Sequence, residues 1–251
     1  MNEQLSRTRL LLGQTGIEKL RAARVAVFGV GGVGGYTVEA LARSGVGALD
    51  LIDDDQVCLS NLNRQIIALH STIGQYKVDV AAARIHDIDP EITVRTYKTF
   101  YTPETAGQFD FTQYDYVVDA IDTVTGKLAL VMQAQAAGVP ILCCMGAGNK
   151  LDPTQLEVAD IYETSVCPLA RVMRNECRKR GVKHLKVVYS REPALTPIPD
   201  PEAPDGGTPA DATRPGGPRR ATPSSTAFVP SVAGLILAGE VIKDLAEYKR
   251  K

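Results

Sequence analysis

Apolar positions along the first 150 residues form short runs that alternate with longer amphipathic stretches. A short apolar run between turn residues is typical of a buried strand, whereas an apolar residue at roughly every third or fourth position is typical of a helix. The pattern predicts one or two short helices within 3–22, strands at 24–28, 48–52, 92–97, 116–120 and 140–144, and helices at 32–44, 77–88 and 127–137.

This alternation predicts an α/β, Rossmann-like fold with a doubly wound, mainly parallel sheet. After residue 151 the spacing changes, and we expect a C-terminal α/β extension with strands at 155–159 and 185–189 and helices at 167–180 and 228–248. Residues 191–226 hold nine of the fifteen prolines, which predicts a long, mobile, Pro-rich loop. In such sheets ligands bind beyond the carboxyl ends of the strands.

Composition and charge limit the classes of function. Apolar residues make up 44% of the chain and charged residues 23%, which is ordinary for a globular protein. The net charge is −1, so no whole-protein field points to nucleic acid, and we expect no DNA partner. The charge is uneven, however, because eight basic residues and one acid lie between Arg171 and Arg191. A solvated helix face is the usual explanation, but Arg171, Arg174 and Arg178 share one helical side and are candidate contacts for a nucleic-acid backbone.

Targeting and cysteine patterns point to the cytoplasm. The first ten residues lack the apolar core of a secretory signal, and the longest apolar run, 228–242, is interrupted by Pro230 and Glu240, so we expect no membrane span. The five cysteines form no C-x-x-C pair, which argues for reduced thiols and against structural zinc. Cys167 precedes a predicted helix and is a candidate reactive thiol.

A glycine loop follows the first predicted strand, with Gly29, Gly31, Gly32 and Gly34 placed where a helix opens. Such a loop lets the backbone approach phosphates, and the helix N-terminus favours their negative charge. Asp53 ends the next strand, where a ribose-binding carboxylate is expected. The pattern indicates a nucleotide but leaves nicotinamide and flavin cofactors open.

Polar residues beyond this loop favour a triphosphate. Asn61, Arg64 and Lys77 follow the ribose acid, and Asp122 lies just past the strand at 116–120. Two cations suit a triphosphate, and a carboxylate suits Mg²⁺. Each residue alone is more often a surface charge, but together they predict ATP chemistry at one edge of the sheet.

The combined motifs resemble the ubiquitin-activating-enzyme-like superfamily, the ThiF/MoeB/HesA group. The resemblance rests on the glycine loop, Asp53-x-Asp55, Ser60-Asn61-Leu-Asn-Arg64-Gln65, Gly74-x-x-Lys77, Asp89-Pro90 and Asp119-Ala-Ile-Asp122. It implies a single adenylating domain over 1–251, with an ATP-binding half at 1–150 and a substrate-side half at 151–251. It further implies Asp53 and Asp55 on the ribose, Asn61, Arg64 and Lys77 on the phosphates, and Asp122 on Mg²⁺. Arg7 matches an arginine that reaches the ATP of the partner subunit in a homodimer.

Further segments resemble the branch that dehydrates threonylcarbamoyladenosine in tRNA. They are Asp54-Asp55-x-Val57-Cys58, Asn63 to Leu69, Gly146-Ala147-Gly148, Leu151 to Gln155, Pro168-Leu169-Ala170 and Ser224 to Ile236. This resemblance implies a tRNA substrate, an acyl-adenylate on the threonyl carboxylate, and closure to a cyclic oxazolone with release of AMP and pyrophosphate. A cysteine desulfurase or sulfur acceptor is a candidate protein partner.

Two alternatives share parts of this sequence pattern. An adenylyltransferase for the C-terminal glycine of a ubiquitin-like sulfur carrier would use the same ATP site, and its relatives usually carry the C-x-x-C pairs that this chain lacks. A nicotinamide dehydrogenase or a non-catalytic nucleotide sensor would need only the glycine loop and Asp53.

Overall fold

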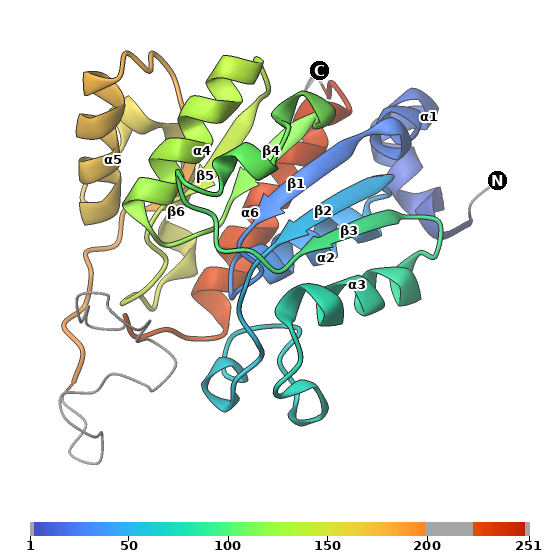
Figure 1. The fold of residues 1–251 in the computed structure, drawn as a ribbon, viewed down its shortest axis with the longest axis horizontal. Helices are drawn as coiled ribbons and strands as arrows, with labels where there is room; N and C mark the ends of the chain where they lie inside the picture. Colours follow the sequence, from blue (N-terminus) through green and yellow to red (C-terminus); the bar gives the residue numbers. More distant parts are fainter. Residues whose placement is uncertain (1–2, 199–222, 249–251) are drawn as a thin grey trace.

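The computed structural model describes residues 3–198 and 223–248. Its centre is one seven-stranded sheet with the strand order β3-β2-β1-β4-β5-β7-β6 (Figure 1). Part of the Pro-rich loop predicted at 191–226, namely residues 199–222, lies outside the described residues. The predicted α/β, mainly parallel, doubly wound sheet is confirmed.

Five parallel strands form the first part of the sheet: β1 (Arg24–Phe28), β2 (Ala48–Ile52), β3 (Thr93–Tyr97), β4 (Tyr116–Asp119) and β5 (Ile141–Cys144). β7 (Lys186–Ser190) pairs parallel to β5, and the edge strand β6 (Leu156–Asp160) pairs antiparallel to β7. β1 and β4 are buried on both faces, as expected for parallel strands covered by helices on both sides. All seven strands begin and end within about two residues of their predicted limits.

Helices cover both faces of the sheet (Figure 1). On one face lie α2 (Gly34–Arg43), α3 (Lys77–Ile88) and α6 (Phe228–Leu245), together with α1 (Ser6–Ala22), which is kinked at Gly13. On the other lie α4 (Val124–Ala137) and α5 (Pro168–Lys179). Leu41 and Leu237 belong to the hydrophobic core on the first face of the sheet. Phe28, Tyr101 and Phe109 form an aromatic cluster in the core on the second face.

The contact between α2 and α6 fixes the start of α2. A Cβ atom on Gly234 would lie 2.3 Å from the Val33 carbonyl oxygen, so only glycine allows this approach. The Thr37 hydroxyl donates to the Gly234 carbonyl at 3.0 Å across the same contact. The C-terminal helix therefore holds the segment that carries the glycine loop.

A buried ion pair joins the carboxyl ends of β4 and β5. The Lys127 ammonium lies 3.0 and 3.1 Å from the two carboxylate oxygens of Asp119 and donates to the Cys144 carbonyl at 2.6 Å. The two side chains are 1% and 0% exposed. Burial by itself lowers the pKa of Lys127, but the attraction of Asp119 outweighs it and the net pKa is raised. The pair holds two neighbouring strand ends together.

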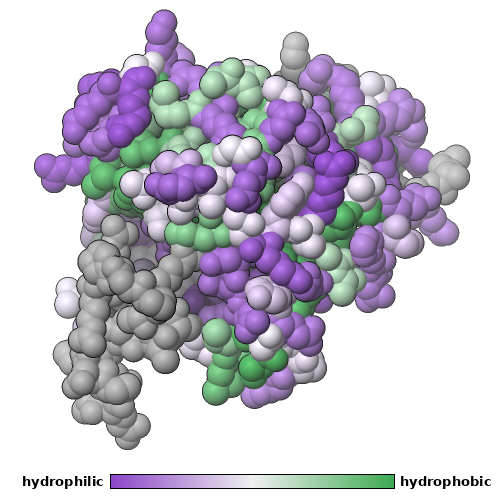
Figure 2. All heavy atoms as spheres, in the orientation of Figure 1, coloured by the Kyte–Doolittle hydropathy of each residue, from purple (hydrophilic) through white to green (hydrophobic). Residues whose placement is uncertain are grey.

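The face of the molecule shown in Figure 2 is mainly polar. Figure 2 shows hydrophobic atoms gathered over the loops between β2 and α3, where Leu59, Leu69 and Ile73 are exposed. Over 3–198 and 223–248, no helix is both long and apolar enough to cross a bilayer.

Replacing Lys127 with Met should cost about 3–5 kcal/mol of unfolding free energy, because Asp119 would keep a buried charge without its partner. Chemical denaturation measures the loss. Lys98→Met is the matched control, because Lys98 pairs with Asp79 at 2.8 Å while both side chains are nearly half exposed. It should cost below about 1 kcal/mol. Equal losses in the two variants would contradict the assignment of Lys127 to the ion pair that joins β4 and β5.

Candidate functional site

The glycine loop turns tightly from β1 toward the end of β4. Gly29 has φ +90°, and a Cβ atom there would lie 2.7 Å from the Ala120 carbonyl oxygen. A Cβ atom on Gly34 would lie 1.8 Å from the Gly29 carbonyl oxygen. These two glycines let the loop fold against β4, whereas Gly31 and Gly32 have room for a Cβ atom and leave their backbone accessible.

Asp53 connects the end of β2 to this loop. One carboxylate oxygen accepts from the Val30 backbone N–H at 2.7 Å, and the other accepts from the Asp55 N–H at 2.9 Å. Burial raises the pKa of Asp53, and the nearby Lys77 ammonium opposes that rise. The carboxylate predicted to meet a ribose therefore also holds the glycine loop against β2.

Lys77 begins α3 and points into the acidic segment after β2. Its ammonium is 2.7 Å from an Asp55 carboxylate oxygen and 4.0 Å from one of Asp53, and the residue is 5% exposed. The carboxylates of Asp53, Asp54 and Asp55 lie within 4.8 Å of one another. Lys77 offsets part of this negative charge, which lets the acids gather at the edge where phosphates are predicted to bind.

Arg64 and Asn61 come from the segment between β2 and α3. The Arg64 side chain passes over the glycine loop, with its Cγ 3.4 Å from the position of a Cβ on Gly32. Its guanidinium donates to the Ser60 carbonyl at 3.0 Å and to Asn63 Oδ1 at 2.9 Å. Asn61 is buried and accepts from the Cys58 N–H at 3.2 Å. Asn61 thus shapes the turn that brings Arg64 to the loop.

Asp122 lies at a cleft of about 440 Å³ beyond the ends of β4 and β5. The cleft runs from Val33, beside the glycine loop, to the start of α5. Its wall also contains Ala120 to Asp122, Cys144 to Lys150, Cys167 to Leu169, Ala194 and Pro223. Asp122 is exposed and makes no hydrogen bond or ion pair with another described residue. An exposed carboxylate oxygen without a protein cation fits a magnesium ligand beside a nucleotide.

Arg7 does not face this edge of its own subunit. It lies in the first turn of α1 and is exposed. α1 leads into the amino end of β1, whereas the glycine loop follows the carboxyl end of the same strand (Figure 1). The structure therefore places Arg7 apart from the other predicted residues of this site.

Cys167 does line the cleft. It is 3% exposed, and its Sγ lies 3.7 Å from the position of a Cβ on Gly146. Val166 precedes it with φ +59°, a backbone conformation that is rare for a β-branched residue. This turn directs the start of α5 toward the cleft, whereas Cys143 and Cys144 are buried in the core.

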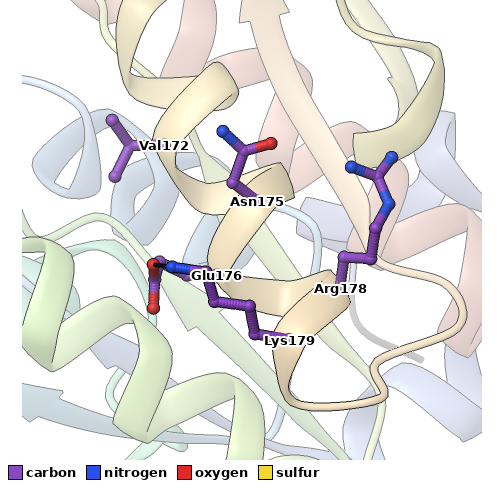
Figure 3. A pocket seen from close by; sticks show the side chains of 5 residues that line it. All are labelled: Val172, Asn175, Glu176, Arg178 and Lys179. Atoms are coloured by element: carbon purple, nitrogen blue, oxygen red, sulfur yellow. Dashed lines mark hydrogen bonds and ion pairs between the residues drawn. The ribbon is translucent and has the colours of Figure 1, made fainter.

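The three predicted arginines of α5 have different surroundings. Arg171 is exposed, Arg174 donates to the Thr164 hydroxyl at 2.8 Å and to the Thr164 carbonyl, and Arg178 lies 5.4 Å from the Tyr162 ring centre. A surface hollow of about 510 Å³ lies along this helix, and two of its lining residues, Glu176 and Lys179, are paired at 2.7 Å (Figure 3). All five of its lining residues come from α5 alone, so it lacks the opposing wall of a ligand site.

Sequence reasoning missed two lysines at the cleft. Lys127 lies directly beneath it and Lys150 forms part of its wall. A single lysine in a helix or a loop is normally exposed, so neither position carried a signal of burial.

The fold and this edge of the sheet together define a nucleotide-binding α/β protein of the doubly wound class. The ThiF family model matches residues 3–251, and the chain belongs to the ThiF family. It is 46% identical over 246 residues to the tRNA threonylcarbamoyladenosine dehydratase of Bacillus subtilis (strain 168), covering 98% of this chain and 95% of that protein.

Two further comparisons agree with this one. The chain is 38% identical over 201 residues to the dehydratase of the same name from Escherichia coli (strain K12), covering 77% of this chain and 75% of that protein. The crystal structure of the E. coli tRNA N6-threonylcarbamoyladenosine dehydratase TcdA in complex with ATP superposes with a TM-score of 0.83 at 31% identity, covering 97% of this chain and 94% of that one.

Proposed function

We propose that this chain is an ATP-dependent tRNA threonylcarbamoyladenosine dehydratase. The observation that carries the proposal is the 46% identity over 98% of the chain to a protein of that name. The cleft supports it, because Val33 and Asp122 beside the glycine loop and Cys167 at the start of α5 line one continuous space. A nucleotide and an acyl substrate can therefore meet there. The sulfur-carrier adenylyltransferase is not favoured.

The proposed reaction has two steps. An oxygen of the threonyl carboxylate bonds to the α-phosphorus of ATP, and the bond to pyrophosphate breaks. The carbamoyl group of the same nucleoside then attacks the activated acyl carbon, and AMP leaves, so the net change is the loss of one water. Both steps rely on positioning and on stabilising charge at the phosphates rather than on a redox group.

Arg64 and Lys77 are the proposed phosphate cations, and Asp53 and Asp55 the proposed ribose ligands. Arg64 already lies over Gly32, while Lys77 is drawn toward Asp55 and would exchange part of that pairing for a phosphate. Mg²⁺ would neutralise phosphate charge when bound, and Asp122 would hold it. Residues 1–150 and 151–251 are proposed as the ATP-binding and substrate-side halves of a single adenylating domain.

A homodimer is proposed as the active form. α1 exposes Leu10 and Leu11, at 85% and 78%, close in sequence to the exposed Arg7. Apolar side chains exposed together favour contact with another subunit. Arg7 would then enter the ATP site of the partner, which it does not approach in its own subunit.

The basic surface of α5 is proposed to contact tRNA. Arg171 is the most available of the three predicted arginines, because Arg174 is bonded to Thr164 and Arg178 lies over Tyr162. A cytoplasmic location suits a tRNA substrate. A sulfur-transfer protein and a reactive Cys167 remain predictions.

Changing Asp122 to Ala or Arg64 to Ala should lower AMP formation by about a hundredfold or more, because each removes a charge-stabilising group at the phosphates. Release of AMP from ATP with modified tRNA gives the rate, and thermal unfolding tests whether the fold is intact. Asp87→Ala is the matched control, because Asp87 is an exposed acid on α3 away from the cleft. Full turnover by either folded site variant would remove that residue from the proposed site.

Arg7→Ala and Asp122→Ala proteins, each inactive alone, should recover activity when mixed as heterodimers. About half of the parent activity is expected for the purified mixed dimer, since each such dimer would hold one intact site out of two. The measurement is AMP release after co-expression and purification of the mixed dimer. An inactive mixed dimer, or a monomer in sedimentation, would argue against the shared site.

A further inference from the structure

Lys150 is a buried lysine in the wall of the cleft. The residue is 4% exposed, and its ammonium donates to the backbone carbonyl of Glu192. The other two buried lysines differ, because Lys77 has a carboxylate oxygen at 2.7 Å and Lys127 has one at 3.0 Å. Among the described residues, no carboxylate lies within ion-pair distance of Lys150.

Two acids adjoin Lys150: Glu192, whose backbone carbonyl it bonds, and Asp152, two residues further along the chain; both carboxylates are engaged elsewhere. The Glu192 carboxylate accepts from the backbone N–H groups of Leu151 and Asp152, each at 2.9 Å. The Asp152 carboxylate accepts from the Thr154 backbone N–H at 2.9 Å and from its hydroxyl at 2.5 Å. These bonds shape the chain that follows Lys150 without neutralising its charge.

Asn149, the residue before Lys150, is also held in place by hydrogen bonds. Asn149 adopts φ +58°, its N–H donates to the Ser224 carbonyl at 2.7 Å, and its side-chain oxygen accepts from the Ser224 N–H at 2.7 Å. The backbone around Lys150 is thus fixed on both sides. Lys150 is one of the residues that line the cleft, and its ammonium is bonded to the Glu192 carbonyl rather than turned out to solvent.

A buried ammonium with one carbonyl partner is an unfavourable arrangement for stability alone. An ammonium has three N–H donors, and burial without an opposite charge is costly. Such a group is well suited to bind an anion that enters the cleft, because the anion supplies the missing charge. The position also matters, since Asp122 and Ala120 at the nucleotide edge line the same cleft.

We propose that Lys150 binds the carboxylate of the threonyl group on the modified adenosine and holds it in the cleft beside the ATP site; this inference rests on the proposed function. A phosphate of the tRNA backbone is the other anion available. The carboxylate is favoured because Lys150 is almost fully buried. A group attached to a single base can reach a buried ammonium more readily than a backbone phosphate of a folded RNA can. Lys150 would then distinguish modified from unmodified tRNA.

The test compares two forms of one tRNA, with threonylcarbamoyladenosine and with unmodified adenosine, by their dissociation constants without ATP. Lys150→Gln keeps a donor for the Glu192 carbonyl and removes the charge. Its affinity for the modified tRNA should fall by about 10- to 100-fold, the range for a charge-assisted hydrogen bond. Its affinity for the unmodified tRNA and for ATP should not change. Lys179→Gln, on the exposed side of α5, is the control and should leave the preference for modified tRNA intact.

Three outcomes would overturn the proposal. An equal loss for both tRNAs would mean that Lys150 binds a backbone phosphate, and no loss for either would mean that it binds neither anion. Should the Gln variant not fold, Lys150→Arg carries the test, because it retains the cation. A folded Arg variant should still prefer modified tRNA. If it binds the unmodified form but has lost this preference, the result counts against carboxylate binding. Failure of the parent protein itself to convert modified tRNA would instead remove the proposed function and this inference together.

Discussion

The cleft depends on two neighbouring strands that end at the same level, and the Lys127–Asp119 ion pair holds them there. Lys127 bonds both to the Asp119 carboxylate at the end of β4 and to the Cys144 carbonyl at the end of β5. Asp119 also accepts from the Ile121 N–H at 3.2 Å, which shapes the turn leading to Asp122. One buried charge pair therefore positions Asp122, which is predicted to bind magnesium, and the segment after Cys144, which lines another part of the cleft.

The glycine loop and the cleft beside it carry cations suited to anions and one carboxylate suited to a cation. Lys77 balances part of the acidic segment after β2, and Arg64 adds a cation over the glycine loop. Asp122 has no cation partner among the described residues, whereas Lys150 has no carboxylate. These two unbalanced groups line the same space. A magnesium nucleotide would supply the cation for Asp122, and an acyl carboxylate would supply the anion for Lys150. Adenylate formation requires these two substrates to lie side by side.

Sequence reasoning could predict the fold because the information is local. Strand and helix periodicity located every strand, and the glycines at 29 and 34 are required by contacts as close as 1.8 Å. The parallel arrangement followed from the alternation of elements. The antiparallel pairing of β6 with β7 did not, because partners of an edge strand are set by long-range contacts.

The placement of the candidate residues was predictable where motifs carry them and unpredictable where burial decides. The glycine loop, Asp53, Arg64, Lys77 and Asp122 meet at one edge as expected from strand order. Helical spacing alone could not reveal that Arg174 is bonded to Thr164, nor that Lys150 and Lys127 are buried. A lysine looks the same in the sequence whether it is solvated or enclosed, and only tertiary packing separates the two cases.

The most direct test of the account is mass spectrometry of nucleosides from tRNA incubated with the purified protein and ATP, digested under mild conditions that preserve a cyclic product. The account predicts that threonylcarbamoyladenosine is replaced by a nucleoside lighter by one water, only when ATP is present and with one AMP released for each nucleoside converted. An unchanged nucleoside mass with active, folded protein and ATP would contradict it.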